Sequence, residues 1–219
     1  MESEKSQMKK IEKSLFALTV IFLMIIILLV PAKLLIFDDD YYKNRFYRTG
    51  VYTEVENADI ILENLLNFFQ RGEELRYFEE NERSHLEDVK ELLDKSFLTF
   101  YIVIIAFIAS LVAMFFINKK DFKDNIFKIV FLSGLCSFVI VVLMLLASLN
   151  FTSTFGNFHK SFFPQGNYSF PENSLLITMF SESFFKAFFL RSIVSSLLIS
   201  VIVMVPQIIK NKIKKRMLP

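Results

Sequence analysis

The chain has 219 residues, of which 53% are hydrophobic and 22% charged, with a formal net charge of +2. A charge this close to zero gives no reason to expect a nucleic-acid partner. The chain also contains no glycine-rich loop of the kinds that cradle nucleotide phosphates. Its single cysteine, Cys136, excludes an intrachain disulfide and any zinc site built from several thiolates.

Long apolar stretches indicate an integral membrane protein. Four stretches hold one charged residue or none: Leu15–Phe37, Phe97–Ile117, Ile129–Leu149 and Ala187–Ile209. Each is long enough to cross a bilayer as a helix, which takes about 20 residues. We therefore predict an all-α polytopic membrane protein with four transmembrane helices and a helical extracytoplasmic loop domain.

The charges outside these stretches sort by sign, which predicts the orientation. Lysines are concentrated near both chain ends and in the connection between the second and third spans, whereas residues 38–96 hold 16 acids and 8 bases. Positive residues stay on the cytoplasmic side, so we expect a multi-pass plasma-membrane protein with both termini in the cytoplasm. The predicted segments are a cytoplasmic N-terminus (1–14), TM1 (15–37), an extracytoplasmic helical loop (38–96), TM2 (97–117), a cytoplasmic loop (118–125), TM3 (126–149), an extracytoplasmic Phe-rich interfacial loop (150–186), TM4 (187–209) and a basic cytoplasmic tail (210–219).

The first outer loop has helical patterns. Apolar residues recur at helical spacing over Glu54–Arg71, and Gly72 follows where a helix-ending residue with positive φ is expected. A second helix is predicted to begin at about Ser84 and to continue into the second span. Its predicted start, Ser84-His85-Leu86-Glu87, has the S-x-x-E pattern of a capping box.

The second outer loop is unusually aromatic, because residues 151–189 hold 11 of the 27 phenylalanines. Pro164 and Pro171 interrupt it, so it does not resemble a further span. We expect this segment to lie in the headgroup region or to re-enter the outer leaflet. The alternative is ordinary packing of the loop onto the first outer domain.

The two histidines of the chain fall one in each outer loop. Spans two and three are joined by a short connection and should be neighbours, so His85 and His159 are predicted to converge near the membrane surface. Two imidazoles there suggest acid–base chemistry on a lipid-borne group. Asp88 is spaced to orient the His85 ring. The alternatives are a surface histidine on a charged helix for His85 and, with Phe158, an interfacial anchor for His159.

One charge in the fourth span has two interpretations. Arg191 lies near its outer end, where it either binds a lipid phosphate or ester oxygen, or extends to the headgroups without a binding role. For Lys33, in the first span, we expect only extension to the headgroups.

No G-x-S-x-G nucleophile motif and no H-E-x-x-H metal motif are present in the sequence. We predict neither a metal site nor a cofactor.

At these residues the sequence resembles a known family. The similar stretches are Phe46-Tyr47-Arg48-Thr49-Gly50, Asn64-Leu65-Leu66-Asn67-Phe68-Phe69, Glu82-Arg83-Ser84-His85-Leu86-Glu87-Asp88-Val89-Lys90, Phe158-His159-Lys160-Ser161-Phe162-Phe163, Pro171-Glu172-Asn173-Ser174-Leu175-Leu176-Ile177 and Met179-Phe180-Ser181-Glu182-Ser183-Phe184-Phe185. Together they resemble the four-span lipoprotein intramolecular transacylase (Lit) family. The combination of H-x-x-D-V-K with a later F-H-x-x-F-F is the most specific part.

The resemblance implies an activity. Enzymes of this type move an acyl chain from the sn-2 ester of a lipoprotein's diacylglyceryl-cysteine to the α-amine of that cysteine. Membrane lipid and the diacylated lipoprotein would be the partners, and no cofactor or nucleotide would take part. His85 and His159 would form the catalytic pair, with Asp88 as an orienting group. The alternative from another class is a non-catalytic membrane protein whose outer domain binds a partner. A histidine-gated transporter fits less well, because ionisable residues are scarce in the spans.

Overall fold

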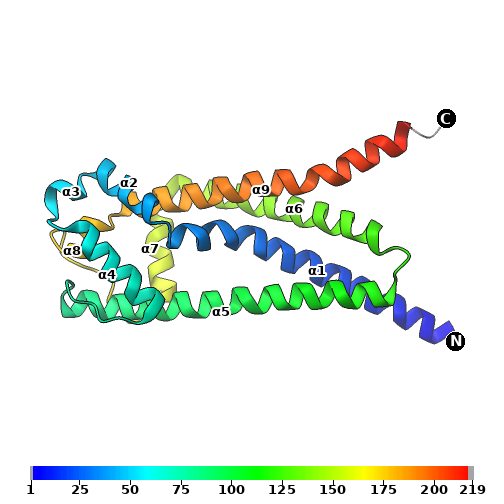
Figure 1. Ribbon diagram of the computed structural model, residues 1–219, viewed down its shortest axis with the longest axis horizontal. Coiled ribbons are helices and arrows are strands. Elements are labelled where there is room, and N and C mark those ends of the chain that lie inside the picture. The colour runs from blue at the N-terminus through cyan, green and yellow to red at the C-terminus, as the bar shows by residue number, and fades with distance from the viewer. Residues whose placement is uncertain (1, 217–219) are drawn as a thin grey trace. The chain divides into compact units, whose positions relative to one another are not determined.

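The computed structural model describes residues 2–216, and all regular structure in that part of the chain is helical. Residue 1 and residues 217–219 of the predicted terminal segments lie outside the described residues. The elements are α1 (Glu2–Ile36), α2 (Asp39–Thr49), α3 (Val51–Glu54), α4 (Ala58–Arg71), α5 (Glu80–Ile117), α6 (Phe122–Ala147), the 3-10 turn η1 (Ser148–Asn150), α7 (Phe151–Phe162), α8 (Leu175–Met179) and α9 (Glu182–Arg216) (Figure 1).

Four helical segments are long and apolar enough to cross a membrane, which confirms the predicted fold class. They are Ser6–Ile36 of α1, α5, Phe122–Phe162 from α6 through α7, and α9. The chain divides into two compact units, and the divisions fall within α1, α5, α6 and α9. Unit 1 comprises Met1–Pro31, Thr99–Met144 and Ile193–Pro219, and unit 2 comprises Ala32–Leu98 and Leu145–Ser192.

Small polar side chains fill the contacts between the helices of unit 1. The Thr19 hydroxyl on α1 donates to the Ser110 hydroxyl on α5 at 2.8 Å. The Ser133 hydroxyl on α6 donates to the Val20 carbonyl on α1 at 3.0 Å. Such residues let backbones approach closely and form hydrogen bonds between helices where lipid offers no partners.

Large apolar side chains of unit 1 point outward instead. Ile105, Phe116 and Ile202 leave 67%, 80% and 65% of their surfaces exposed. In water, so many exposed apolar side chains would promote association. In a bilayer they face acyl chains, so this distribution is the one expected of a bundle that has lipid as its solvent.

The start of α1, the α5–α6 connection and the end of α9 lie at the same end of unit 1 (Figure 1). The Asn118 amide in the α5–α6 connection donates to the Glu12 carboxylate on α1 at 2.8 Å. Near the end of α9, Lys210 forms an ion pair with Asp124, at the start of α6, with an N–O distance of 2.7 Å. These contacts place the three segments on one side of the bundle.

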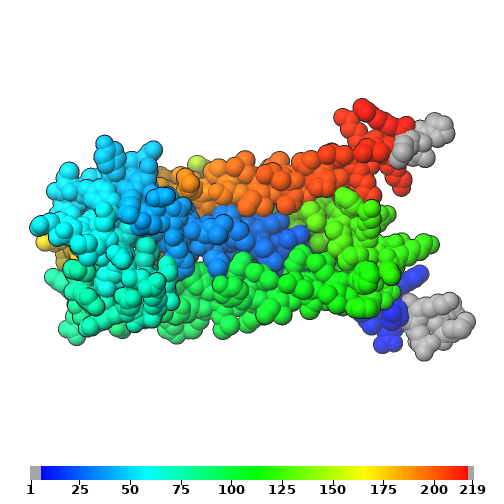
Figure 2. Space-filling view, in the orientation of Figure 1, coloured from blue at the N-terminus to red at the C-terminus, as the bar shows by residue number. Residues whose placement is uncertain are grey.

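Unit 2 has an apolar core between α2, α4, α8 and the first turns of α5 and α9, and the side chains of α2–α4 appear in blue and cyan in Figure 2. Phe46, Leu62 and Met179 are the most deeply buried members of this core. Gly72 ends α4 with a φ of 72°, which confirms its predicted role as a helix-ending residue.

The helix predicted over Glu54–Arg71 is confirmed over Ala58–Arg71, but its predicted start is wrong, because α3 ends at Glu54 and α4 begins at Ala58. Asn57 separates them with a φ of 58°. Asparagine tolerates this left-handed conformation better than most residues, and a helix cannot propagate through it. The apolar periodicity therefore belongs to α4.

The predicted capping box at Ser84 is also wrong, because α5 begins at Glu80. The Glu82 carboxylate accepts a hydrogen bond from the Glu79 backbone N–H at 2.9 Å. This is the acidic half of a capping box one turn earlier. His85 consequently lies in the second turn of α5 rather than directly after its cap.

The Phe-rich segment 150–186, predicted to be an outer loop, is largely helical. It contains α7 and α8, and Leu176, Met179, Phe180 and Phe184 belong to the core of unit 2. The second part of this segment therefore packs onto the 38–96 segment, as the alternative interpretation predicted. Its apolar residues are buried against α2 and α4.

Gly134 offers a test of close helix packing in unit 1. A Cβ at this position on α6 would lie 2.7 Å from the Ser200 carbonyl oxygen of α9. We expect Gly134→Ala to destabilise the protein by about 1–3 kcal/mol through overpacking, seen as a lower thermal unfolding midpoint in detergent. Gly156→Ala is the matched control, because a Cβ there meets nothing within 4 Å. Equal midpoints for the two variants would contradict this packing.

Candidate functional site

His85 is a buried histidine on α5 within unit 2. Only 7% of its surface is exposed, and its Nδ1 atom has no hydrogen-bond partner among the described residues. The rings of Phe163 and Phe170 lie against it, with centroid distances of 4.8 and 5.6 Å. The alternative of a solvent-exposed surface histidine therefore does not apply.

His159 lies near the end of α7 and is partly exposed. Its Nδ1 atom lies 2.8 Å from the Phe155 carbonyl oxygen, one helical turn earlier. A carbonyl can only accept a hydrogen bond, so Nδ1 carries the proton, and in the neutral ring Nε2 holds the free lone pair. The Phe155 and Tyr168 rings flank the imidazole at centroid distances of 4.3 and 5.2 Å.

The structure brings the two histidines together. Their ring centroids are 6.0 Å apart and their planes differ by 25°. Phe163 contacts both rings, at 4.8 Å from His85 and 5.7 Å from His159. The result is a pair of imidazoles with an apolar aromatic surround, formed by α5, α7 and the segment after α7.

Two carboxylates on α5 hold that following segment next to His85. The Asp88 carboxylate accepts hydrogen bonds from the Gln165 and Asn167 side-chain amides, at 2.7 and 2.5 Å. The Glu82 carboxylate, only 1% exposed, accepts from the Leu176 backbone N–H at 2.8 Å. The structure thus gives Asp88 loop amides as its hydrogen-bond partners, and no hydrogen bond joins it to His85 among the described residues.

Sequence reasoning missed the role of Glu82. It is one of several acids at the start of α5, and no local pattern marks it as the buried one. Its partner, Leu176, is 94 residues away in the chain. Only the tertiary structure identifies it.

The environment of His85 favours the neutral imidazole. His85 precedes the apolar stretch of α5 and lies outside the predicted span. Burial, followed by the neighbouring His159 ring, lowers the pKa of His85 from 6.5 to about 4, against opposing effects of Asp88 and Asn167. At neutral pH its side chain is therefore uncharged, and one ring nitrogen has a lone pair that can accept a proton.

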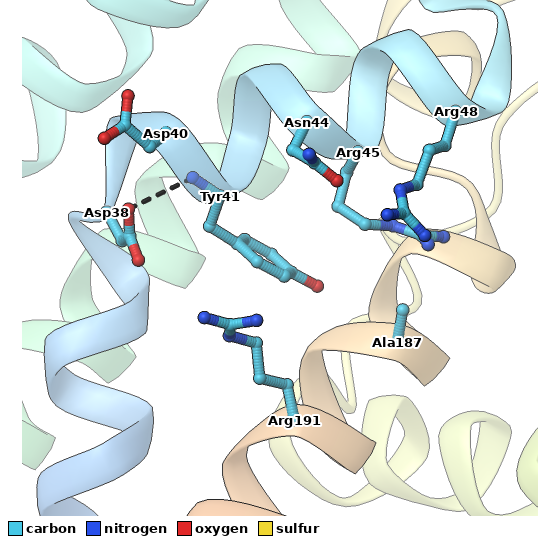
Figure 3. Close-up of a pocket in the computed structure, with 8 residues that line it drawn as sticks. All are labelled: Asp38, Asp40, Tyr41, Asn44, Arg45, Arg48, Ala187 and Arg191. Carbon is cyan, nitrogen blue, oxygen red and sulfur yellow. Dashed lines mark hydrogen bonds between the residues drawn. The ribbon is translucent and has the colours of Figure 1, made fainter.

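Arg191 is not part of this arrangement. It lies on α9 over the Tyr41 ring, 5.8 Å from the ring centroid, and lines a separate pocket that includes neither histidine (Figure 3). Among residues 6–216 there is also no group of three His, Cys, Asp or Glu side chains placed to hold a metal ion.

Comparison with known proteins links this geometry to one family. The family model described as lipoprotein intramolecular transacylase Lit matches residues 17–185, a range that includes both histidines. No curated protein sequence matches the chain.

Solved structures of the membrane-integral lipoprotein intramolecular transacylase Lit from Bacillus cereus are similar in fold. One has a TM-score of 0.79 at 17% identity and covers 95% of this chain and 99% of its own. A variant of that protein with a histidine-to-arginine mutation has a TM-score of 0.76 at 19% identity, with 99% and 98% covered. A histidine-to-alanine variant has a TM-score of 0.75 at 19% identity, with 98% and 99% covered.

The low pKa of His85 can be measured directly. In His159→Phe, which retains an aromatic ring at the second position, His85 is the only histidine left. We expect its NMR titration midpoint to stay below the ordinary 6.5, because burial is the largest cause of the shift. Denaturation should return it to about 6.5. A midpoint of 6.5 or above in the folded variant would show that the ring is solvated.

Proposed function

Because the chain belongs to the lipoprotein intramolecular transacylase (Lit) family, we propose that it catalyses acyl transfer within a diacylated lipoprotein, with His85 and His159 as the acid–base pair. The acyl chain moves from the sn-2 ester of the diacylglyceryl group to the α-amine of the lipidated cysteine. The single observation that supports this most is the contact between the two imidazoles, 6.0 Å between centroids, in an aromatic surround.

The reaction needs a proton to change position. The cysteine nitrogen attacks the ester carbonyl carbon, a C–N bond forms, and the bond from that carbon to the sn-2 oxygen breaks. A proton leaves the amine and ends on the sn-2 oxygen. We assign His85 as the base that takes the proton from the amine, since its buried imidazole is neutral. The Nε2 lone pair of His159 accepts this proton in turn and passes it to the sn-2 oxygen, since Nδ1 is held by Phe155.

Both reacting groups belong to one substrate molecule, so positioning supplies much of the rate. Phe163 and Phe170 beside His85, and Tyr168 beside His159, limit the access of water to the imidazoles. Exclusion of water favours attack by the amine over hydrolysis of the same ester. Asp88 and Glu82 act as positioning residues, because they hold the segment that carries these rings.

We further propose that unit 2 faces the outside of the plasma membrane. The lysine-rich ends of α1 and α9 lie with the α5–α6 connection, and such segments stay in the cytoplasm. The acidic segment 38–96 and the Phe-rich segment 150–186 would then be extracytoplasmic.

The histidine pair is tested by a double-mutant cycle. A positioned acid or base contributes about 10²–10⁴-fold to the rate, so His85→Ala and His159→Ala should each reduce conversion of a reporter lipoprotein by about that factor. The double variant should convert the reporter only slightly more slowly than the less active of the two single variants, because the effects of groups that act as a unit are not additive. Mass spectrometry of the lipoprotein N-terminus measures the lyso-form, normalised to inserted enzyme.

Lys160→Ala is the control, since this residue follows His159 and is exposed. It should convert the reporter at the wild-type rate. Wild-type conversion by either single histidine variant would overturn the proposed pair. Loss of conversion in chelator, restored by added metal, would replace the acid–base mechanism with a two-histidine metal site.

The orientation is tested by cysteine labelling in a Cys136→Ser background. Glu74 and Asn211 are both exposed, the first in unit 2 and the second near the end of α9. A cysteine at Glu74 should react with a membrane-impermeant maleimide in intact cells, whereas one at Asn211 should react only after permeabilisation. The reverse labelling would invert the topology.

A further inference from the structure

A cluster of arginines in unit 2 lines a second pocket, which the proposed acyl transfer does not use. The pocket has a volume of about 430 Å³, within the range of small-ligand sites. Arg45 and Arg48 on α2 lie together on one side of it (Figure 3). The Arg191 guanidinium group of α9 lies on the other side, against the Tyr41 ring and toward Asp38 (Figure 3).

The three guanidinium groups are not neutralised by ion pairs. Within the described part of the chain, none of them forms a salt bridge. Arg45 donates to the Ser183 carbonyl at 3.3 Å, but its buried Nε atom has no hydrogen-bond partner. Arg45 and Arg48 are three residues apart on one helix, and like charges at this spacing repel each other.

The Tyr41 hydroxyl is a further hydrogen-bond donor without a partner in this pocket. Tyr41 is 8% exposed, and its hydroxyl oxygen is buried without a hydrogen-bond partner. Figure 3 shows this hydroxyl directed into the space between the arginines. Burial raises the pKa of Tyr41 above its ordinary value, against the opposing charges of Arg45 and Arg191, so the hydroxyl keeps its proton and can donate.

The acids at the edge of the pocket do not satisfy these donors. Asp38 caps α2, with its carboxylate accepting the Tyr41 backbone N–H at 3.1 Å. Asp38 and Asp40 lie on the side of the pocket away from Arg45 and Arg48 (Figure 3). The unmet donors therefore call for a ligand with several negatively charged oxygens.

We propose that this pocket binds a phosphate group. A phosphate offers enough oxygen atoms for the unmet donors, and arginine forks match its geometry. The group could belong to a phospholipid headgroup or to free phosphate. Arg191 lies near the start of the apolar stretch 187–209, and an arginine at the end of a span reaches headgroup depth.

Ligand-induced stabilisation of the purified full chain in an uncharged detergent tests this site. The probes are phosphatidylglycerol, a diacylglycerol with the same acyl chains, inorganic phosphate, and acetate, all at matched ionic strength. A ligand bound to the native state raises the unfolding midpoint with concentration. We expect phosphatidylglycerol to raise the midpoint and the diacylglycerol not to do so.

The variants assign the effect to the pocket. Arg48→Gln and Arg191→Lys should each lose most of the shift, the latter because lysine lacks the bidentate fork. Both side chains are exposed, so the variants should fold. Arg71→Gln, which removes an exposed arginine outside the pocket, should keep the whole shift. Tyr41→Phe should leave the ligand-free midpoint unchanged or higher, since it removes an unpaired hydroxyl, yet reduce the shift with ligand.

The source of the phosphate follows from the probes. A shift with phosphatidylglycerol alone identifies a lipid headgroup, and a shift with inorganic phosphate identifies the free anion as a sufficient ligand. The proposed site would be overturned if neither phosphatidylglycerol nor inorganic phosphate raised the unfolding midpoint, or if acetate raised it equally. It would also be overturned if Arg71→Gln lost as much of the shift as the pocket variants. Acyl transfer by the same variants is a separate measurement, so failure of this site leaves the histidine mechanism unaffected.

Discussion

Two carboxylates, placed three residues before and three residues after His85, hold the candidate site together. Glu82 accepts a hydrogen bond from the backbone N–H of Leu176, the second residue of α8, and Asp88 accepts from the side-chain amides of Gln165 and Asn167. The segment between these attachment points carries Phe170, which contacts His85 directly. The contact of the Phe170 ring with the imidazole, and its share of the burial of His85, therefore depend on these hydrogen bonds. A buried carboxylate is stable here because backbone donors offset the loss of water.

Units 1 and 2 pack their helices with different kinds of side chain. Unit 2 buries large rings such as Phe46 and Phe180 and exposes charge, as a domain in water does. Unit 1 has the small residues Thr19, Ser133 and Gly134 at its helix contacts. Lipid is as apolar as a large hydrocarbon side chain, so burying such side chains between the helices gains no hydrophobic free energy.

Hydrophobic length and charge were sufficient to predict the four spans, because both are properties of a local stretch of sequence. The approach of His85 to His159 was also predictable, since a short connection makes the second and third spans neighbours. The burial of Glu82 was not predictable, because it depends on Leu176, which is distant in the chain. The helix start at Glu80 was missed because the S-x-x-E pattern at Ser84 indicated a start one turn too late, whereas Glu82 caps the helix through the Glu79 N–H. Likewise, the spacing of Asp88 on α5 correctly placed it near His85 but could not reveal Gln165 and Asn167 as its partners. Arg45 and Tyr41 carried no motif, and only the fold of α2 against α9 groups them with Arg191.

The outward-facing side chains of unit 1 determine which substitutions the membrane surface tolerates. Ile105, Phe116 and Ile202 are exposed, and a bilayer requires of each only a bulky hydrocarbon of no particular shape. Exchange among leucine, isoleucine, valine and phenylalanine there alters no packed contact and no hydrogen bond, so it should change the free energy of unfolding very little. The small residues between the helices do not have this freedom, because a Cβ added at Gly134 would meet the backbone of the neighbouring helix.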